Sequence, residues 1–170
     1  AGFSLGEIPA LAYAGVLSTG DAFKLVVIRG TKMGELSTKY AGGMAAALKL
    51  APEVVEETCK EFKEIWPVNY NCPGQIVITG WKEDVEQAAD ALKEAGAKRV
   101  LPLNVSGPFH SYLLEEAGEK LGRFLENIPV SEPVIPYVAN VTAAYVTKAE
   151  DVKPLLTRQV SSSVRWQQSV

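Results

Sequence analysis

Cysteine and histidine are scarce in this sequence, which limits the chemistry that it can carry. The 170 residues include two cysteines, Cys59 and Cys72, and one histidine, His110. The cysteines match no metal-ligand spacing and are too few for a disulfide framework, so we expect neither a metal site nor a cross-linked fold. A reducing cytoplasm is the expected compartment. An organelle stays open if a targeting segment was lost with the N-terminus.

Long hydrophobic runs and an excess of positive charge are also missing. No apolar run reaches the ~18 residues that a membrane-spanning helix requires. Acidic residues outnumber Lys and Arg by 20 to 17, for a net charge of -3, whereas nucleic-acid-binding domains usually carry a strong basic excess. The sequence therefore argues against a membrane span and against nucleic acid as a partner. Hydrophobic residues make up 47% of the chain, enough for the core of one globular domain.

The first residues are unusual for the start of a protein. Ala1 is not an initiator methionine, and a motif typical of an active-site turn follows it directly. No basic-then-apolar signal segment is present. We therefore expect the chain to be part of a longer protein.

The middle of the chain alternates between short apolar runs and helical patterns. Pro52 opens one predicted helix, because proline is favoured in a first helical turn, and Gly96 closes another. The predicted elements are strands at 44–50, 66–70, 75–79 and 98–103 and helices at 52–63 and 82–95. Their order, β-α-β-β-α-β, predicts a ferredoxin-like unit.

The segments on either side are predicted to be mainly helical. Ser18 lies three residues before Asp21, which is typical of a helix start. The predicted helices lie at 5–14, from Ser18 to about Met33, at 112–126 and at 151–160, with Phe23, Val26 and Val27 on the apolar face of the second. We interpret the polar, glycine-containing residues 32–43 as a connection and the apolar run 134–138 as a buried strand.

Residues 2–6, Gly-Phe-Ser-Leu-Gly, match the G-x-S-x-G pattern of a nucleophile elbow. A serine on such a tight turn has an exposed hydroxyl, and the amide of the next residue, Leu5, points at the developing oxyanion. The helix that follows adds the positive end of its dipole. The pattern also arises by chance, and Ser4 is then a helix N-cap between two glycines.

His110 is the only base available to a serine nucleophile, because its imidazole has a pKa near neutral pH. It follows Gly107-Pro108, which indicates a loop, where functional residues are frequent. A purely structural histidine is the alternative.

Arg29 lies in a mostly apolar stretch, so its guanidinium needs an anionic partner, and its planar fork suits a carboxylate. A solvated arginine near a helix end is the alternative. Asn69 and Asn71 lie at a predicted turn, which asparagine caps well. The residues alone therefore leave all three roles open.

Several uncommon strings occur along the chain in a fixed order. They are GFSLGE at 2–7, ALAYAGVLS at 10–18, IRG at 28–30, NYNCPGQIVITG at 69–80, LPLNVSGPFHS at 101–111, VANVTA at 138–143 and RQVSSSVRW at 158–166. Together they resemble the malonyl-CoA:acyl carrier protein transacylases and the related acyltransferase domains of fatty acid and polyketide synthases. The resemblance covers essentially the whole chain and is far more specific than any one motif.

The resemblance implies a role for each matching residue. Ser4 is similar to the nucleophile that becomes malonylated, and His110 to the base that activates it and later protonates the departing thiolate. Arg29 is similar to the arginine that pairs with the free malonyl carboxylate, and Gln159 to the residue whose backbone carbonyl orients the histidine. The remaining matches are Asn69 and Asn71, beside the cleft, and Phe109, the bulky residue that accompanies malonyl rather than methylmalonyl selection.

The resemblance also implies an α/β fold. Residues 1–43 and 104–170 are expected to form part of an α/β-hydrolase-like acyltransferase core, and residues 44–103 an inserted ferredoxin-like (βαββαβ) subdomain. Family members carry an upstream glutamine-rich segment and a C-terminal glycine-proline-glycine stretch that have no match in this sequence. We therefore expect a chain truncated at both ends.

The implied activity is transfer of a malonyl group from malonyl-CoA to the pantetheine thiol of acyl carrier protein in fatty acid biosynthesis. The coenzyme A thioester is a substrate, and no cofactor or metal is expected. Three alternatives stay open: an acyltransferase domain of a polyketide synthase, an α/β serine hydrolase, and a catalytically silent carrier-protein-binding module of the same ancestry. An α/β serine hydrolase usually has the acidic member of its catalytic triad between Ser and His in the sequence, and it has no use for Arg29.

Overall fold

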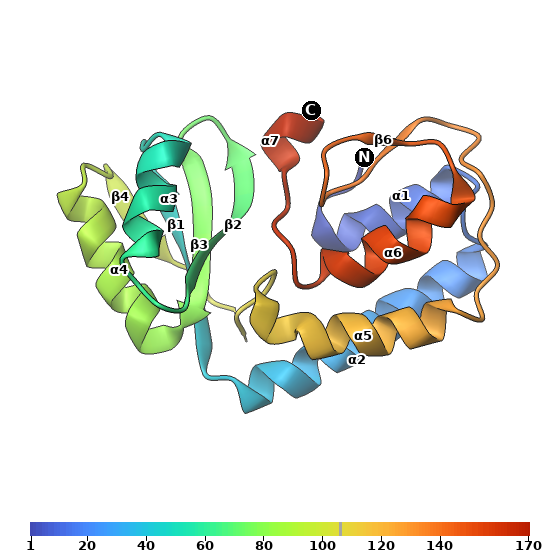
Figure 1. Ribbon diagram of the computed structural model, residues 1–170, viewed down its shortest axis with the longest axis horizontal. Helices are drawn as coiled ribbons and strands as arrows, with labels where there is room; N and C mark the ends of the chain where they lie inside the picture. The colour runs from blue at the N-terminus through green and yellow to red at the C-terminus, as the bar shows by residue number, and fades with distance from the viewer. Residues whose placement is uncertain (106) are drawn as a thin grey trace.

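The computed structural model describes residues 1–105 and 107–170, so Ser106 of the predicted histidine loop lies outside the described residues. Two lobes lie side by side (Figure 1). The small lobe contains a four-stranded sheet, and the helical lobe contains both chain ends and most of the helices. The chain enters the small lobe from the end of one long helix and returns after the last strand of the sheet.

The small lobe has the predicted β-α-β-β-α-β order. Its elements are β1 (Gly42–Leu48), α3 (Pro52–Lys60), β2 (Ile65–Cys72), β3 (Gln75–Trp81), α4 (Lys82–Glu94) and β4 (Arg99–Pro102). The strands pair antiparallel in the order β2-β3-β1-β4, which is the arrangement of a ferredoxin-like sheet. This part of the predicted α/β fold is confirmed. The division into units 44–103 and 1–43 with 104–170 stays a prediction.

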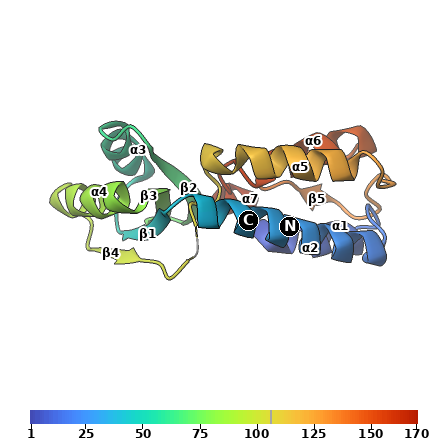
Figure 2. The ribbon, with the colours of Figure 1, turned by 90° about the horizontal axis from the view of Figure 1, so that it is seen from below.

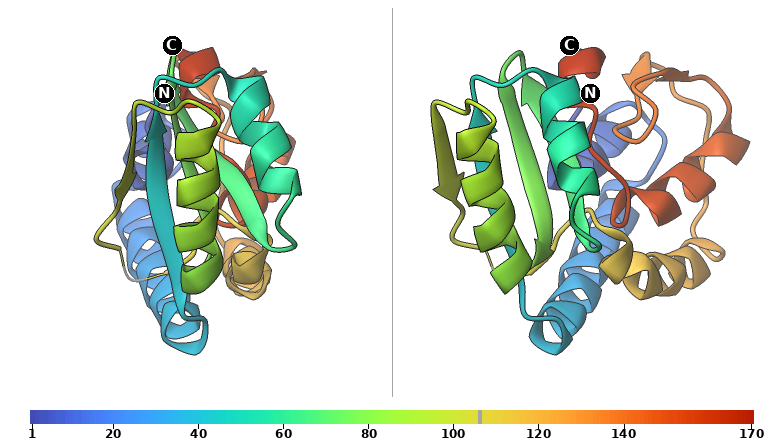
Figure 3. Two further views of the ribbon diagram at one scale, coloured as in Figure 1. Left: turned by 90° about the vertical axis from the view of Figure 1, so that its left-hand side faces the viewer. Right: turned by 60° about the vertical axis from the view of Figure 1, so that its left-hand side comes forward.

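The two faces of the sheet have different partners, because side chains alternate along a strand. Helices α3 and α4 cover one face, where Val55 and Leu92 pack against Ile76 and Ile78 (Figure 3). On the other face, Met44, Ala46, Val68 and Val77 form a smaller cluster with Val105 and Phe109 from the chain that returns to the helical lobe. The second face therefore meets the segment that carries His110.

The helical lobe is built from segments at both ends of the chain. Its elements are the short 3₁₀ turn η1 (Ser4–Gly6), α1 (Glu7–Tyr13), α2 (Thr19–Lys39), η2 (Tyr112–Leu114), α5 (Glu115–Leu125), β5 (Tyr137–Val138), β6 (Tyr145–Val146), α6 (Ala149–Gln159) and α7 (Trp166–Ser169). One apolar core joins α1, α2, α5 and α6, with Leu11, Leu25, Leu121 and Leu156 buried inside it, whereas α7 lies against β2 of the small lobe. Figure 2 shows α2 and α5 lying next to each other along this lobe.

Helix α2 is longer than predicted and buries a different face. It continues to Lys39 instead of ending near Met33, because Leu36 still packs into the core. The interpretation of 32–43 as a connection is therefore wrong for most of its length. The predicted apolar face is wrong for Phe23 and Val27, which are 70% and 50% exposed, whereas Val26 packs against the core beside the buried Ala22 and Leu25.

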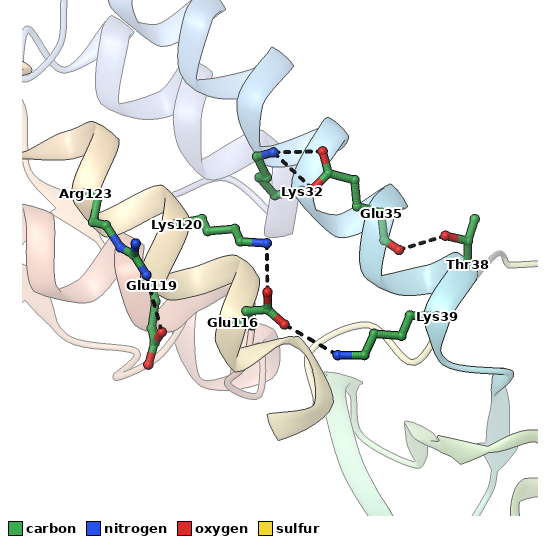
Figure 4. A network of polar contacts seen from close by, with 8 residues as sticks. All are labelled: Lys32, Glu35, Thr38, Lys39, Glu116, Glu119, Lys120 and Arg123. Atoms are coloured by element: carbon green, nitrogen blue, oxygen red, sulfur yellow. Dashed lines mark hydrogen bonds and ion pairs between the residues drawn. The ribbon is translucent and has the colours of Figure 1, made fainter.

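Ion pairs mark the solvent side of the contact between α2 and α5 (Figure 4). Glu116 forms ion pairs with Lys120 of its own helix, at 2.8 Å, and with Lys39 of α2, at 3.7 Å. These pairs are exposed and contribute little to stability. The polar composition of the last turns of α2 thus reflects a solvated helix face rather than a loop.

The apolar run 134–138 does not form the predicted buried strand. Val134 is 79% exposed, and only Tyr137–Val138 pairs, with Tyr145–Val146. Pro133 and Pro136 have no amide hydrogen to donate, which limits pairing in this segment.

The segment after α6 joins the two lobes. The amide of Val164 donates to the carbonyl of Val68 at 2.7 Å, and the amide of Tyr70 donates to the carbonyl of Val164 at 3.0 Å. Val164 therefore extends the edge of the small-lobe sheet at β2. This contact fixes the main chain just beyond Gln159.

Candidate active site

Ser4 lies on a sharp turn in a left-handed backbone conformation, with φ of 47°. Such a conformation is costly for a residue other than glycine and is often found at functional sites. A Cβ on Gly2 would lie 1.9 Å from the carbonyl oxygen of Gly6, so only glycine fits at position 2. A Cβ on Gly6 would meet nothing within 4 Å. The first glycine of the G-x-S-x-G pattern is therefore a steric requirement of this turn, whereas the second is not.

His110 lies between the Ser4 hydroxyl and two main-chain carbonyls at the end of α6 and just after it. Its Nε2 lies 2.8 Å from the hydroxyl oxygen of Ser4. Its Nδ1 lies 3.0 Å from the carbonyl oxygen of Gln159 and 3.2 Å from that of Ser162. Carbonyl oxygens only accept hydrogen bonds, so Nδ1 carries the ring proton and Nε2 is left to accept from Ser4. This is the tautomer that a general base for a serine requires.

The environment of His110 keeps the ring neutral at physiological pH. Burial, and then the nearby charge of Arg29, lower the pKa of His110 to about 4, while the two carbonyl contacts act in the opposite direction. A neutral imidazole can take a proton from a hydroxyl group.

Arg29 reaches the same hydroxyl group from α2. It is only 6% exposed, and its Nη2 donates to the Ser4 hydroxyl oxygen at 2.9 Å. Burial lowers the pKa of Arg29 to about 10, against the opposing effect of the Glu7 charge. The guanidinium therefore stays charged near pH 7, and an anion bound beside Ser4 would pair with it.

Ser4, Arg29 and His110 share a cavity of about 410 Å³ between the two lobes. Asn69 and Phe109 line it as well, together with the apolar side chains of Met33, Met44, Leu103 and Val105. In the described part of the chain, the side-chain oxygen of Asn69 is a buried polar atom without a hydrogen-bond partner. Because buried polar atoms are nearly always paired, an N–H group of a ligand is a suitable partner for it.

The other two predicted residues have different positions. Leu5 lies in the 3₁₀ turn that begins at Ser4, and amides in a first helical turn have no partner within the helix. Asn71 is absent from the residues that line the cavity. Its side-chain amide donates instead to Gln75 across the β2–β3 turn at 3.1 Å, and its assignment to the site stays a prediction.

Asn140 and Glu7 belong to this site, although the sequence did not identify them. The side-chain oxygen of Asn140 accepts from the amide of Ser4 at 2.6 Å, and its NH₂ group donates to the carbonyl of Gly2 at 2.7 Å. Burial raises the pKa of Glu7, while bonds from Tyr137 and Gln159 lower it. Both residues lie inside recognised strings, GFSLGE and VANVTA. Only the fold shows that the two strings meet.

Replacing Asn140 with Ala is expected to destabilise the protein by about 1–3 kcal/mol, because two partly buried backbone groups of the serine turn lose their partners. The measurement is the free energy of unfolding in urea. Thr142→Ala is the control, since Thr142 lies in the same loop and accepts only from the Ala144 amide. Equal losses in both variants would show that Asn140 supports the loop rather than the serine turn.

Two features are absent from the described residues, a metal-binding cluster and a membrane-spanning helix. Among the residues described, no three His, Cys, Asp or Glu side chains come together in a way that could hold a metal ion. Every helix of residues 1–105 and 107–170 is too short or too polar to cross a bilayer.

Covalent acyl transfer is the chemistry that a serine, a neutral histidine and a buried cation in one cavity can perform. The chain belongs to the acyl transferase domain family, whose pattern matches residues 1–170. The resemblance found in the sequence is thereby confirmed.

The chain is similar to named relatives over its whole length. It is 44% identical to the malonyl CoA-acyl carrier protein transacylase of Salmonella typhimurium and 42% identical to that of Bacillus subtilis, with all of this chain covered in both. It spans 56% and 55% of those two relatives. The chain thus corresponds to about half the length of the curated proteins that it matches.

Solved structures agree with this assignment. An acyl carrier protein S-malonyltransferase from Vibrio cholerae superposes with a TM-score of 0.95 at 40% identity, over 98% of this chain and 56% of that one. A malonyl-transacylase in complex with a type II PKS acyl-carrier protein superposes with a TM-score of 0.93 at 43% identity, over 98% of this chain and 55% of that one. The fold of the described residues is therefore that of the transacylases.

Proposed function

We propose that the protein transfers a malonyl group from malonyl-CoA to the pantetheine thiol of acyl carrier protein, through an ester on Ser4. The observation that carries the proposal is the position of the Ser4 hydroxyl, 2.8 Å from Nε2 of His110 and 2.9 Å from Nη2 of Arg29. One neighbour can take the serine proton, and the other can pair with the free carboxylate of a malonyl group. Fatty acid biosynthesis is the pathway that the named relatives suggest.

Two transfers of the same kind complete the reaction. In the first, the Ser4 oxygen forms a bond to the thioester carbon as its proton moves to His110. The carbon–sulfur bond then breaks, and His110 returns the proton to the coenzyme A thiolate. In the second, the carrier thiol gives its proton to His110 and attacks the ester, and Ser4 regains a proton as it leaves. The amide of Leu5 stabilises the oxyanion in both steps.

Three residues that line the cavity would determine which acyl group and carrier arm it accepts. Arg29 favours acyl groups with a terminal carboxylate, because an acetyl group leaves the buried charge unpaired. Phe109 limits the room for an α-methyl group, although one methyl group contributes only ~1–3 kcal/mol of discrimination. The unpaired oxygen of Asn69 is suited to an amide N–H of the pantetheine arm.

The remaining parts of the proposal concern the whole protein. We place the reaction in the cytoplasm, with malonyl-CoA and acyl carrier protein as partners and the coenzyme A thioester as a substrate, without a cofactor. The named relatives support the two partners, and one similar structure is a complex with an acyl-carrier protein. We also propose that residues 44–103 form one unit, the small lobe, and that 1–43 and 104–170 belong to the catalytic unit.

The deciding experiment is intact-protein mass spectrometry of the purified protein that carries this sequence, with malonyl-CoA. We expect a gain of one malonyl group, mapped by peptide sequencing to Ser4. Holo acyl carrier protein should discharge it, while the apo form, which has no pantetheine thiol, should not.

Each other outcome selects a different function. Loss of the adduct to water at equal rates with both carrier forms would indicate a hydrolase. Binding of carrier protein without any adduct would indicate a catalytically silent module. A requirement for a carrier from polyketide synthesis would place the enzyme in that pathway.

A further inference from the structure

The side chain of Gln159 makes contacts that are separate from the carbonyl that holds His110. Its NH₂ group donates to Oε2 of Glu7 and to the main-chain carbonyl of Ser4, each at 2.7 Å. Its oxygen accepts from Nε of Arg29 at 3.3 Å. Gln159 is 2% exposed and Glu7 is 1% exposed. Because water does not compete for these bonds, they fix the geometry strongly.

Glu7 determines which way the Gln159 amide points. If the amide turned over, its oxygen would face a carboxylate and a carbonyl, and its NH₂ group would face a guanidinium. All three contacts would be repulsive, since carboxylates and carbonyls only accept and guanidinium only donates. The Glu7 carboxylate accepts in turn from the hydroxyl of Tyr137 and from the main-chain N–H of Asn140, the latter at 3.2 Å. The orientation of Gln159 is therefore set by buried groups of the helical lobe.

Of the three contacting side chains Glu7, Gln159 and Arg29, it is Arg29 that lines the cavity. Its Nε is occupied by Gln159, so the fork of its terminal nitrogens is directed at Ser4. A long side chain held at Nε loses less rotamer freedom when it binds an anion. Glu7 and Gln159 do not line the cavity, so their side chains reach a bound acyl group through the residues they hold, Arg29 and the main chain of Ser4.

We infer that the side chains of Glu7 and Gln159 are positioning residues for Arg29, and that they set the preference for acyl groups ending in a carboxylate. The inference rests on the proposed malonyl transfer. The preference is then controlled by two residues that never touch the acyl group. The main-chain carbonyl of Gln159 serves the histidine, while its side chain serves the arginine.

Gln159→Met separates these two roles, because it keeps the carbonyl at His110 and a side chain of similar length. We expect the ratio of malonyl to acetyl acylation rates to fall about 10-fold, since a hydrogen bond to a charged group is lost. The malonyl rate should fall more than the acetyl rate, because only a malonyl group has a carboxylate to pair with Arg29. Rates are measured by rapid quench with malonyl-CoA and acetyl-CoA.

Glu7→Gln is a second variant of the same shape, which keeps the test valid if Gln159→Met does not fold. It removes one acceptor and allows the Gln159 amide to turn over, so the same ratio should fall about 3- to 10-fold. Glu35→Gln is the matched control, because Glu35 is an exposed glutamate of α2 whose carboxylate accepts from Lys32, away from the cavity. Its ratio should equal that of wild type.

A double-mutant cycle with Arg29→Met decides the mechanism. If Gln159 acts through Arg29, Gln159→Met changes the ratio no further in the Arg29→Met background. Equal losses of both rates in Gln159→Met, or an additive effect in the double variant, would overturn the inference and leave malonyl transfer intact. A wild-type protein that accepts no malonyl group would instead remove the proposed function and the inference with it.

Discussion

Replacing His110 with Ala is expected to slow the acylation of Ser4 by about 10²- to 10⁴-fold, the range that a general base supplies. The reason is that Nε2 is the only base within hydrogen-bond distance of the Ser4 hydroxyl among the described contacts. The measurement is the single-turnover rate of acylation with malonyl-CoA, and Ser4→Ala, which lacks the nucleophile, gives the background. Ser111→Ala is the control, because Ser111 lies in the same loop and its hydroxyl donates to the carbonyl of Pro108 rather than to Ser4 or His110.

The pH dependence tests the same role independently. His110 must be neutral to accept a proton, and its pKa of about 4 lies below the usual 6.5. The rate at which a neutral fluorophosphonate labels Ser4 should therefore stay level as the pH falls through 6.5, and then decline near pH 4. A decline of the labelling rate near pH 6.5 would mean that His110 has its ordinary pKa and that the imidazole is exposed to water. A normal labelling rate in His110→Ala would exclude His110 as the base.

Replacing Arg29 with Met should lower the ratio of malonyl to acetyl acylation by roughly 100-fold, because a charge-assisted contact to the carboxylate is lost. Most of the change should appear in the malonyl rate, since an acetyl group has no carboxylate to pair with Arg29. Both rates are measured at a range of thioester concentrations, so that effects on binding and on the chemical step are separated.

Arg123→Met provides the matched control, since Arg123 is an exposed arginine of α5 whose pair with Glu119 lies on the surface. Its ratio should be that of wild type. If Arg29→Met lowers both acylation rates by the same factor, Arg29 acts on the Ser4 hydroxyl rather than on the substrate carboxylate. The selectivity assigned to it would then be wrong.

The small lobe was predictable from the sequence because its signals are local. Pro52 and Gly96 limit helices, and the turn after Asn71 separates two strands, so the order of elements follows directly. The error at the end of α2 occurs where distant packing decides. The last turns of α2 look like a loop in sequence, but Leu36 is buried against the core of the helical lobe.

The residues of the candidate site also divide into those with a local sequence signal and those that only long-range contacts reveal. Ser4, Arg29 and His110 stood out because a G-x-S-x-G turn, a charge in an apolar run and a lone histidine are unusual in themselves. Asn140 and Glu7 have no such signal. Their importance depends on a contact across 133 or more residues, from the Glu7 carboxylate to the Asn140 amide and from the Asn140 side chain to the serine turn.

The sequence by itself determined the family, the order of the small-lobe elements and the residue types available for chemistry. Only the tertiary structure decided the ring proton of His110, the direction of the Arg29 side chain and the roles of Glu7 and Asn140. The physical reason is that short-range signals record backbone preferences, whereas hydrogen-bond direction in a buried network depends on which donors and acceptors the fold brings together.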